Sequence, residues 1–267
     1  MKKIVLVLVG LMVSVMFCAP AIAHFQMVYT PEIALAKGGE IDLKIVFSHP
    51  FEAGHTMNMG TPEQFFVVHK EKKKDLLNTL KPITWTSLTN SGKAYETSYK
   101  LRGMGDWIFC LTPAPYWEEA DGIYIQQITK TVVNVAGLPT DWEAEVGLPA
   151  EIVPLNKPYN MLTGNVFRGI IKSNGKPVPF AEIEVEYINH TPQMDKNAFA
   201  PKENAQTPPT FGWPTTIYAN AQGEFSYGIP KAGFWGFCAL GVGPAKEFKG
   251  KELSQDAVIW IHAVDMK

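Results

Sequence analysis

The residues of this chain best suited to chemistry are histidines near the start of the expected mature sequence. His24 directly follows Ala21-Ile22-Ala23, a small-x-small pattern typical of signal-peptide cleavage. Cleavage there would give His24 a free α-amine, and the amine and Nδ1 of one N-terminal histidine can chelate one metal ion. This arrangement, a histidine brace, suits nickel, copper and zinc. The alternative is a frayed terminus in which His24 is accidental.

A second group of candidate ligands lies between residues 49 and 59. The segment holds two imidazoles, one carboxylate and two thioethers: His49, Glu52, His55, Met57 and Met59. Imidazole and thioether together supply soft and intermediate ligands for a transition-metal ion. The alternative is a turn whose methionines pack into the core and whose second histidine is solvated. We expect His49 to reach the same point in space as His24, because the intervening chain is long enough to return there.

Other chemistry has weaker support. His69, His190 and His262 occupy positions where a structural role is more common. The chain has no Gly-x-Ser-x-Gly, no His-Glu-x-x-His and no glycine-rich phosphate loop. Glu118 and Glu119 are neighbours whose side chains face apart, so they do not form a glycosidase pair by themselves.

The composition is that of a folded protein that does not bind nucleic acid. Of 267 residues, 46% are hydrophobic and 19% charged, and 24 Lys and Arg oppose 26 Asp and Glu. The formal net charge of −2 and the lack of a long basic run argue against nucleic acid as a partner.

Residues 1–23 have the three parts of a cleaved signal peptide. Lys2 and Lys3 precede an apolar stretch over residues 4–17, which is too short for a stable transmembrane helix. Phe17 is too bulky to precede a lipid-modified Cys18, so we expect no lipid anchor. Cleavage after Ala23 would leave 22 basic and 26 acidic side chains, and we expect the mature protein in the periplasm.

Two cysteines remain after cleavage, and we expect both to be free. Cys110 and Cys238 each lie within an apolar, strand-like run. Buried free thiols fit this pattern better than a disulfide, although an oxidising compartment permits one.

Apolar residues alternate with polar ones through both halves of the chain, a pattern typical of β-strands. Strands and the loops between them must therefore position the candidate residues. We predict an all-β fold of two consecutive antiparallel β-sandwich domains, residues 24–157 and 158–267, divided by a proline-rich connector over 137–159. In the second half we expect two hairpins and a long loop over 189–212. The period-two segments of the first half are residues 40–48, 64–69, 83–87, 94–102, 106–111 and 123–135.

Several of these segments resemble one known family. They are similar to the secreted domain-of-unknown-function family that contains NikK-like accessory proteins of nickel and cobalt uptake. The resemblance rests on His24-Phe25, Phe47-Ser48-His49-Pro50-Phe51-Glu52 with Met57 and Met59, residues 113–118 (PAPYWE), residues 126–130 (QQITK), residues 151–155 (EIVPL), residues 174–179 (NGKPVP) and residues 233–237 (GFWGF).

The resemblance implies a periplasmic protein that binds Ni(II) or Co(II) before the membrane component of an energy-coupling-factor transporter takes the ion. It implies metal-binding roles for His24 and His49, and no enzyme activity. Residues 174–179 with Gly223-Glu224-Phe225 also resemble transthyretin-like or carboxypeptidase-regulatory-like sandwiches. Three alternatives stay open: a periplasmic copper carrier, a copper-dependent oxidative enzyme with a histidine brace, and a structural module without a metal site.

Overall fold

The computed structural model describes residues 24–266, and the expected signal peptide lies outside them. The described chain forms three β-sheets and one short 3₁₀ turn, Leu77–Thr79, with no α-helix. The prediction of an all-β fold is therefore confirmed. No helix in the described part of the chain is long and apolar enough to cross a membrane.

The first sheet has six strands, and β1 lies at one of its edges. The order is β1 (Phe25–Tyr29), β3 (Glu40–Ser48), β7 (Ser91–Lys100), β6 (Lys81–Thr86), β17 (Ala198–Glu203) and β16 (His190–Gln193).

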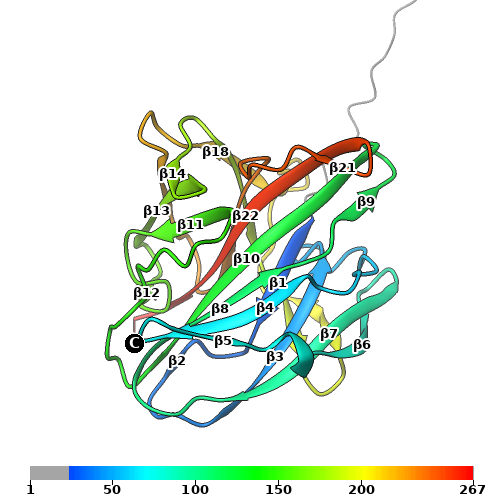
Figure 1. The fold of residues 1–267 in the computed structure, drawn as a ribbon. Coiled ribbons are helices and arrows are strands. Elements are labelled where there is room, and N and C mark those ends of the chain that lie inside the picture. The colour runs from blue at the N-terminus through cyan, green and yellow to red at the C-terminus, as the bar shows by residue number, and fades with distance from the viewer. Residues whose placement is uncertain (1–23, 267) are drawn as a thin grey trace, which may run out of the picture.

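The second sheet has twelve strands and runs through the whole molecule (Figure 1). Its main path is β18 (Thr215–Tyr218), β15 (Glu182–Tyr187), β20 (Gly233–Ala239), β22 (Lys251–Val264), β10 (Ile123–Val135), β8 (Gly105–Thr112), β4 (Gln64–His69) and β5 (Lys72–Asp75). Four short strands pair beside this path: β2 (Ala34–Leu35), β9 (Tyr116–Glu118), β12 (Met161–Leu162) and β21 (Glu247–Phe248).

The third sheet has four strands and covers part of the second. Its members are β11 (Ala150–Pro154), β13 (Val166–Ser173), β14 (Lys176–Pro177) and β19 (Glu224–Gly228). Phe167 of β13 packs on Phe237 of β20, with ring centroids 4.8 Å apart. At the other end of the long sheet, Tyr99 of β7 packs edge-on against Phe109 of β8. Each half therefore has a sandwich core.

Strand pairing crosses the expected boundary near residue 157. β10 and β22 form a parallel pair from Tyr124↔Leu253 to Thr131↔Trp260, and they lie side by side in Figure 1. β11 precedes residue 157 but pairs with β13. The two sandwiches thus share one sheet, and the expectation of purely antiparallel pairing is corrected at this junction. The interval from β10 to β22 supplies the long crossover that a parallel pair requires.

The predicted long loop over residues 189–212 is corrected in part. β16 and β17 form an antiparallel pair inside it, and Ala198 pairs with Thr86 of β6. The strands are short, contain prolines, and extend a sheet whose other strands belong to the first half. A local periodicity could not reveal such a distant partner.

One predicted hairpin of the second half is wrong, and the other is shorter than predicted. β18 and β19 flank the turn at residues 220–223, but β18 pairs with β15 and β19 pairs with β13. At the turn over residues 173–176, β13 does pair with the two-residue strand β14, whereas β15, the expected partner, belongs to another sheet. In both places the chain crosses from one layer of the sandwich to the other, and a turn motif alone does not distinguish that path from a full hairpin.

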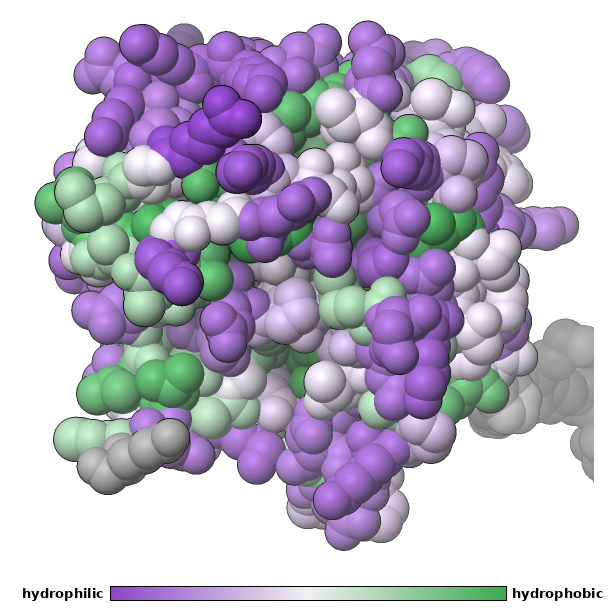
Figure 2. All heavy atoms as spheres, turned by 90° about the horizontal axis from the view of Figure 1, so that it is seen from below, coloured by the Kyte–Doolittle hydropathy of each residue, from purple (hydrophilic) through white to green (hydrophobic). Residues whose placement is uncertain are grey.

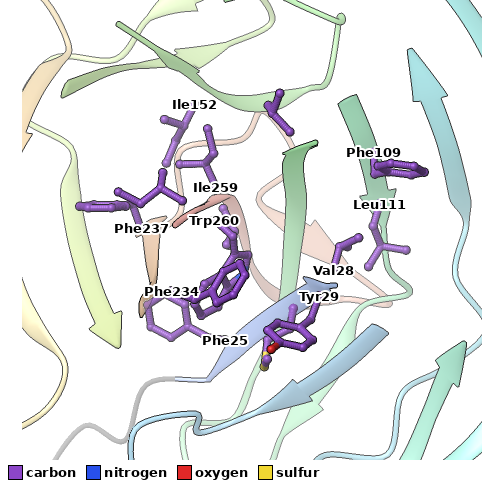
Figure 3. Packing of buried hydrophobic residues seen from close by; sticks show 14 of the residues in the cluster. Phe25, Val28, Tyr29, Phe109, Leu111, Ile152, Phe234, Phe237, Ile259 and Trp260 are labelled. Atoms are coloured by element: carbon purple, nitrogen blue, oxygen red, sulfur yellow. The ribbon is translucent and has the colours of Figure 1, made fainter. Parts of the chain in front are cut away.

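The core joins both halves of the chain. Phe25 of β1 packs edge-on against Trp260 of β22, and Figure 3 shows these side chains together with Phe234. Cys110 and Cys238 are buried and free, as predicted. On the face shown in Figure 2, apolar atoms occupy small areas between polar ones, as expected of a surface in contact with water.

A buried ion pair fixes the connector against the long sheet. Lys130 Nζ lies 2.7 Å from Glu151 Oε1, and the two side chains are 1% and 4% exposed. Glu151 also accepts hydrogen bonds from the backbone N–H groups of Val146 and Leu148. The proline-rich segment is therefore held in place although it has little regular structure.

We expect Lys130→Met to lower the free energy of unfolding by about 3–5 kcal/mol, because it leaves the Glu151 carboxylate buried without its cation. Lys130→Met with Glu151→Gln should recover part of this loss, since the amide is neutral and still accepts the backbone hydrogen bonds. Chemical denaturation measures both. Equal stability of the single and double variants would contradict this account.

A second electrostatic prediction concerns Glu184 on β15. Burial, followed by the negative charges of Asp256 and Glu182, raises the pKa of Glu184 to about 7. The folded protein therefore binds a proton here that the unfolded chain releases near pH 4, so this group makes stability fall as pH rises from about 4 to about 7.

We expect Glu184→Gln to reduce this decline by about 1–2 kcal/mol, a figure that allows for the water still reaching the side chain. Denaturation midpoints at pH 4.5 and pH 7.5 check it. Glu252→Gln on β22 is the control, because that side chain is exposed and its charge does not contribute to the raised pKa of Glu184. An unchanged pH profile in Glu184→Gln would show that the carboxyl does not titrate in this window.

Candidate functional site

Two of the predicted histidines lie together at the ends of neighbouring strands. β1 and β3 are antiparallel, and their register begins at Phe25↔Ser48, so His24 and His49 lie just beyond the same end of the ladder. Their ring centroids are 4.6 Å apart. The prediction that His49 reaches the position of His24 is confirmed. Backbone pairing decides this placement, because the register leaves the two side chains side by side.

Glu118 completes the surroundings of His24. The Nε2 atom of His24 lies 3.0 Å from Glu118 Oε2, and the two side chains are 15% and 14% exposed. Glu118 ends β9, which pairs with the start of β10 through Ile123↔Glu118. Tyr116, two residues earlier on β9, also lies near the His24 ring, with centroids 6.2 Å apart.

Glu118 is the functional candidate that sequence reasoning missed. The sequence did hold one signal for it. Tyr116 and Glu118 are two residues apart, and such residues on a strand share a face. The sequence offered no reason to place that face against His24, because β9 reaches it only through the pairing of β9 with β10.

His55 lies near the pair but makes a different contact. It is exposed, and its Nε2 lies 3.3 Å from Nδ2 of Asn90. Its backbone carbonyl accepts a hydrogen bond from Ser48 Oγ, at 3.0 Å, which holds the loop against the end of β3. His55 is close enough for its charge to affect the pKa of His24.

The two methionines are buried in the hydrophobic core. Met57 is fully buried, and its backbone N–H donates to the Phe47 carbonyl. Met59 is 5% exposed, and its sulfur accepts a hydrogen bond from Gln26 Nε2 at 3.7 Å. Met59 also lines a cavity of about 10 Å³ together with Phe47 and Tyr116, whose rings both contact His24. The structure therefore gives both methionines packing roles in the core.

The loop that carries His49 is held by the second half of the chain. The backbone N–H of Phe51 donates to Glu186 Oε1 at 2.8 Å. The backbone N–H of Asn189 donates to the Pro50 carbonyl at 3.2 Å. Residues at the end of β15 therefore fix the two positions that follow His49.

The electrostatics of the site favour a neutral His24. Burial, with a smaller contribution from His55, lowers the pKa of His24 to about 4. A nearby carboxylate favours the protonated ring, but burial has the larger effect here. At neutral pH the ring then donates from Nε2–H to Glu118, which leaves the lone pair on Nδ1. A carboxylate on the far nitrogen of a metal-binding histidine commonly fixes the tautomer in this way.

The side chains alone do not form a complete metal site. Among residues 24–266, no group of three His, Cys, Asp or Glu side chains is arranged to hold a metal ion. His24 and His49 place two imidazoles together, and the α-amine of His24 would be a further nitrogen donor once residues 1–23 were removed. The donors that remain are nitrogens, which suit Ni(II), Co(II) and Cu(II).

We expect the His24 ring of the metal-free protein to titrate near pH 4, and to carry its proton on Nε2 at pH 7. Because the unfolded ring is protonated below about pH 6.5, this residue lowers stability as pH falls from 6.5 toward 4. Long-range ¹⁵N NMR measures both the titration and the tautomer. Glu118→Leu should weaken the Nε2–H preference, whereas a wild-type midpoint near 6.5 would contradict the placement of the ring.

Comparison with known proteins shows distant structural likeness. The D0-D1 domain of intimin is 10% identical over 90% of this chain and 100% of that chain, with a TM-score of 0.24. The Yersinia pseudotuberculosis adhesin InvE is 11% identical over 88% of this chain and 58% of that chain, with a TM-score of 0.23. These scores are too low to support an argument about function.

The family comparison is more informative. No curated protein matches the sequence. A family model described as a domain of unknown function, DUF4198, matches residues 21–243, which include every candidate residue of the site. The chain therefore belongs to the DUF4198 family.

Proposed function

We propose that this protein binds a divalent transition-metal ion, Ni(II) or Co(II), in the periplasm as an accessory to metal uptake. In this proposal the ligands are the α-amine and Nδ1 of His24 and the imidazole of His49. Glu118 holds His24 in the tautomer that frees Nδ1. His55 lies at the exposed side of the site, where it can meet an arriving ion.

The observation that carries the proposal is the 4.6 Å separation of the His24 and His49 ring centroids, with Glu118 on the opposite nitrogen of His24. Burial lowers the pKa of His24, so its ring is neutral at pH 7, and the neutral imidazole is the metal-binding form. The resemblance to NikK-like proteins supports nickel or cobalt as the ion and a membrane transporter component as the partner.

The placement of the methionines favours a divalent ion over Cu(I). Thioether ligands select Cu(I), but Met57 is fully buried in the core and the Met59 sulfur accepts a hydrogen bond from Gln26. Nitrogen donors with a neighbouring carboxylate suit divalent ions.

The free amine provides the decisive test. Processed protein beginning at His24, obtained by secretion and verified by mass spectrometry, should bind Ni(II) tightly in calorimetry. A variant that retains one extra residue converts the amine to an amide, which hardly loses its proton near neutral pH. We expect this variant and His24→Ala each to bind at least tenfold more weakly, about 1.4 kcal/mol.

His69→Ala is a matched control, because His69 lies at the end of β4 and stacks on Trp107, with ring centroids 3.7 Å apart. It should bind Ni(II) like the wild type. Equal affinity of the extended and processed forms would show that the amine is not a ligand. Consumption of oxygen and a reductant by the copper-loaded protein would favour the oxidative enzyme instead.

A further inference from the structure

The N-terminal strand is held by a side chain of β10 as well as by its neighbour β3. Gln127 is 3% exposed, and its Nε2 donates to the His24 carbonyl at 2.7 Å. Its Oε1 accepts the backbone N–H of Gln26 at 2.8 Å. One side-chain amide thus binds the backbone on both sides of Phe25.

This contact reproduces the hydrogen bonding of a parallel β-strand. In a parallel pair, one residue donates to the carbonyl before its partner and accepts from the N–H after it. The Gln127 amide makes these two bonds around Phe25. It therefore acts as one residue of an additional strand along the open edge of β1.

Further side chains continue the same edge. Thr131 Oγ1 donates to the Val28 carbonyl at 2.9 Å, and Trp260 Nε1 donates to the Gln26 carbonyl at 2.8 Å. Gln127 and Thr131 are four residues apart on β10, so they share one face of that strand. Side chains of the long sheet thus supply hydrogen bonds to the backbone groups along the open edge of β1.

Gln127 is the member of this set that touches His24 itself. The His24 carbonyl carbon is bonded to the Cα atom that carries both the imidazole and the backbone nitrogen. Holding that carbonyl fixes the position of this Cα atom at the start of the expected mature chain, which would otherwise fray. Both proposed donor atoms of His24 extend from the Cα atom that this hydrogen bond holds in place.

We propose that Gln127 is a positioning residue for the metal site: its amide orients His24 so that the amine and Nδ1 face His49. The inference rests on the proposed function. Gln127 also connects the second half to the site, since its Nε2 lies 3.3 Å from Cys238 Sγ on β20 and 3.4 Å from Asp256 Oδ2 on β22.

The test compares Gln127→Met with Gln126→Met in the secreted, processed protein. The two glutamines are adjacent and similarly buried, but Gln126 points to the other face of β10. There it donates to the Pro113 carbonyl and accepts from Gln255. Both variants lose buried hydrogen bonds, so both should lower the denaturation midpoint. In contrast, only Gln127→Met should change the affinity for the metal ion and its coordination geometry.

We expect Gln127→Met to weaken Ni(II) binding at least tenfold and to change the electron paramagnetic resonance spectrum of bound Cu(II), used as a probe of ligand geometry. Gln126→Met should keep the wild-type affinity and spectrum. If Gln127→Met does not fold, Gln127→Asn takes its place, with the same expected loss. Its amide is one methylene too short to bridge both backbone groups.

Two results would overturn the inference while leaving the proposed function intact. One is wild-type affinity and spectrum in the Gln127 variant. The other is an equal loss in both glutamine variants, which would indicate a general effect of destabilisation. By contrast, a wild-type protein that binds neither Ni(II) nor Co(II) would overturn the proposed function itself, and this inference with it.

Discussion

The parallel pairing of β10 with β22 is the constraint on which the rest of this structure depends. It joins strands that more than a hundred residues separate, and it makes one sheet of strands from both halves. β10 is consequently buried on both faces over most of its length, and each face makes a specific contact. Gln127 and Thr131 bind the edge of β1 on one face, and Lys130 pairs with Glu151 on the other.

The candidate site shows how a surface site can depend on a distant core. His24 comes from the first strand, His49 follows the end of the neighbouring strand, and Glu118 comes from the short strand that precedes β10. The long sheet places β9 through its pairing with β10, and the Gln127 side chain of β10 holds the backbone of β1. The burial that results keeps the His24 pKa near 4, because a charged ring would lose more hydration than Glu118 returns. The same packing that excludes water therefore keeps the imidazole neutral at pH 7, which is the form that the proposed metal site requires.

The second half of the chain also has a defined relation to the site. Glu186 and Asn189 hold the backbone that follows His49, while Trp260 holds the backbone that follows His24. These contacts give a physical reason for a binding segment near the N-terminus to be attached to a second sandwich. An exposed loop and a chain terminus are otherwise among the most mobile parts of a protein. Hydrogen bonds from a rigid sheet remove that mobility where the two histidines meet.

The sequence by itself determined the all-β class, most strand positions and the two buried free cysteines, and its chain length permitted the approach of His24 to His49. These follow from local periodicity and from chain length, which act over neighbouring residues. Tertiary structure alone decided that β10 pairs in parallel with β22, that residues 190–203 extend the first sheet, and that Glu118 rather than a methionine contacts His24. Each of these outcomes depends on which distant segment supplies the hydrogen bonds for an unpaired strand edge or for a buried polar group. Alternation along one strand indicates which residues face inward, but the partner they meet is set by the pairing of the whole sheet.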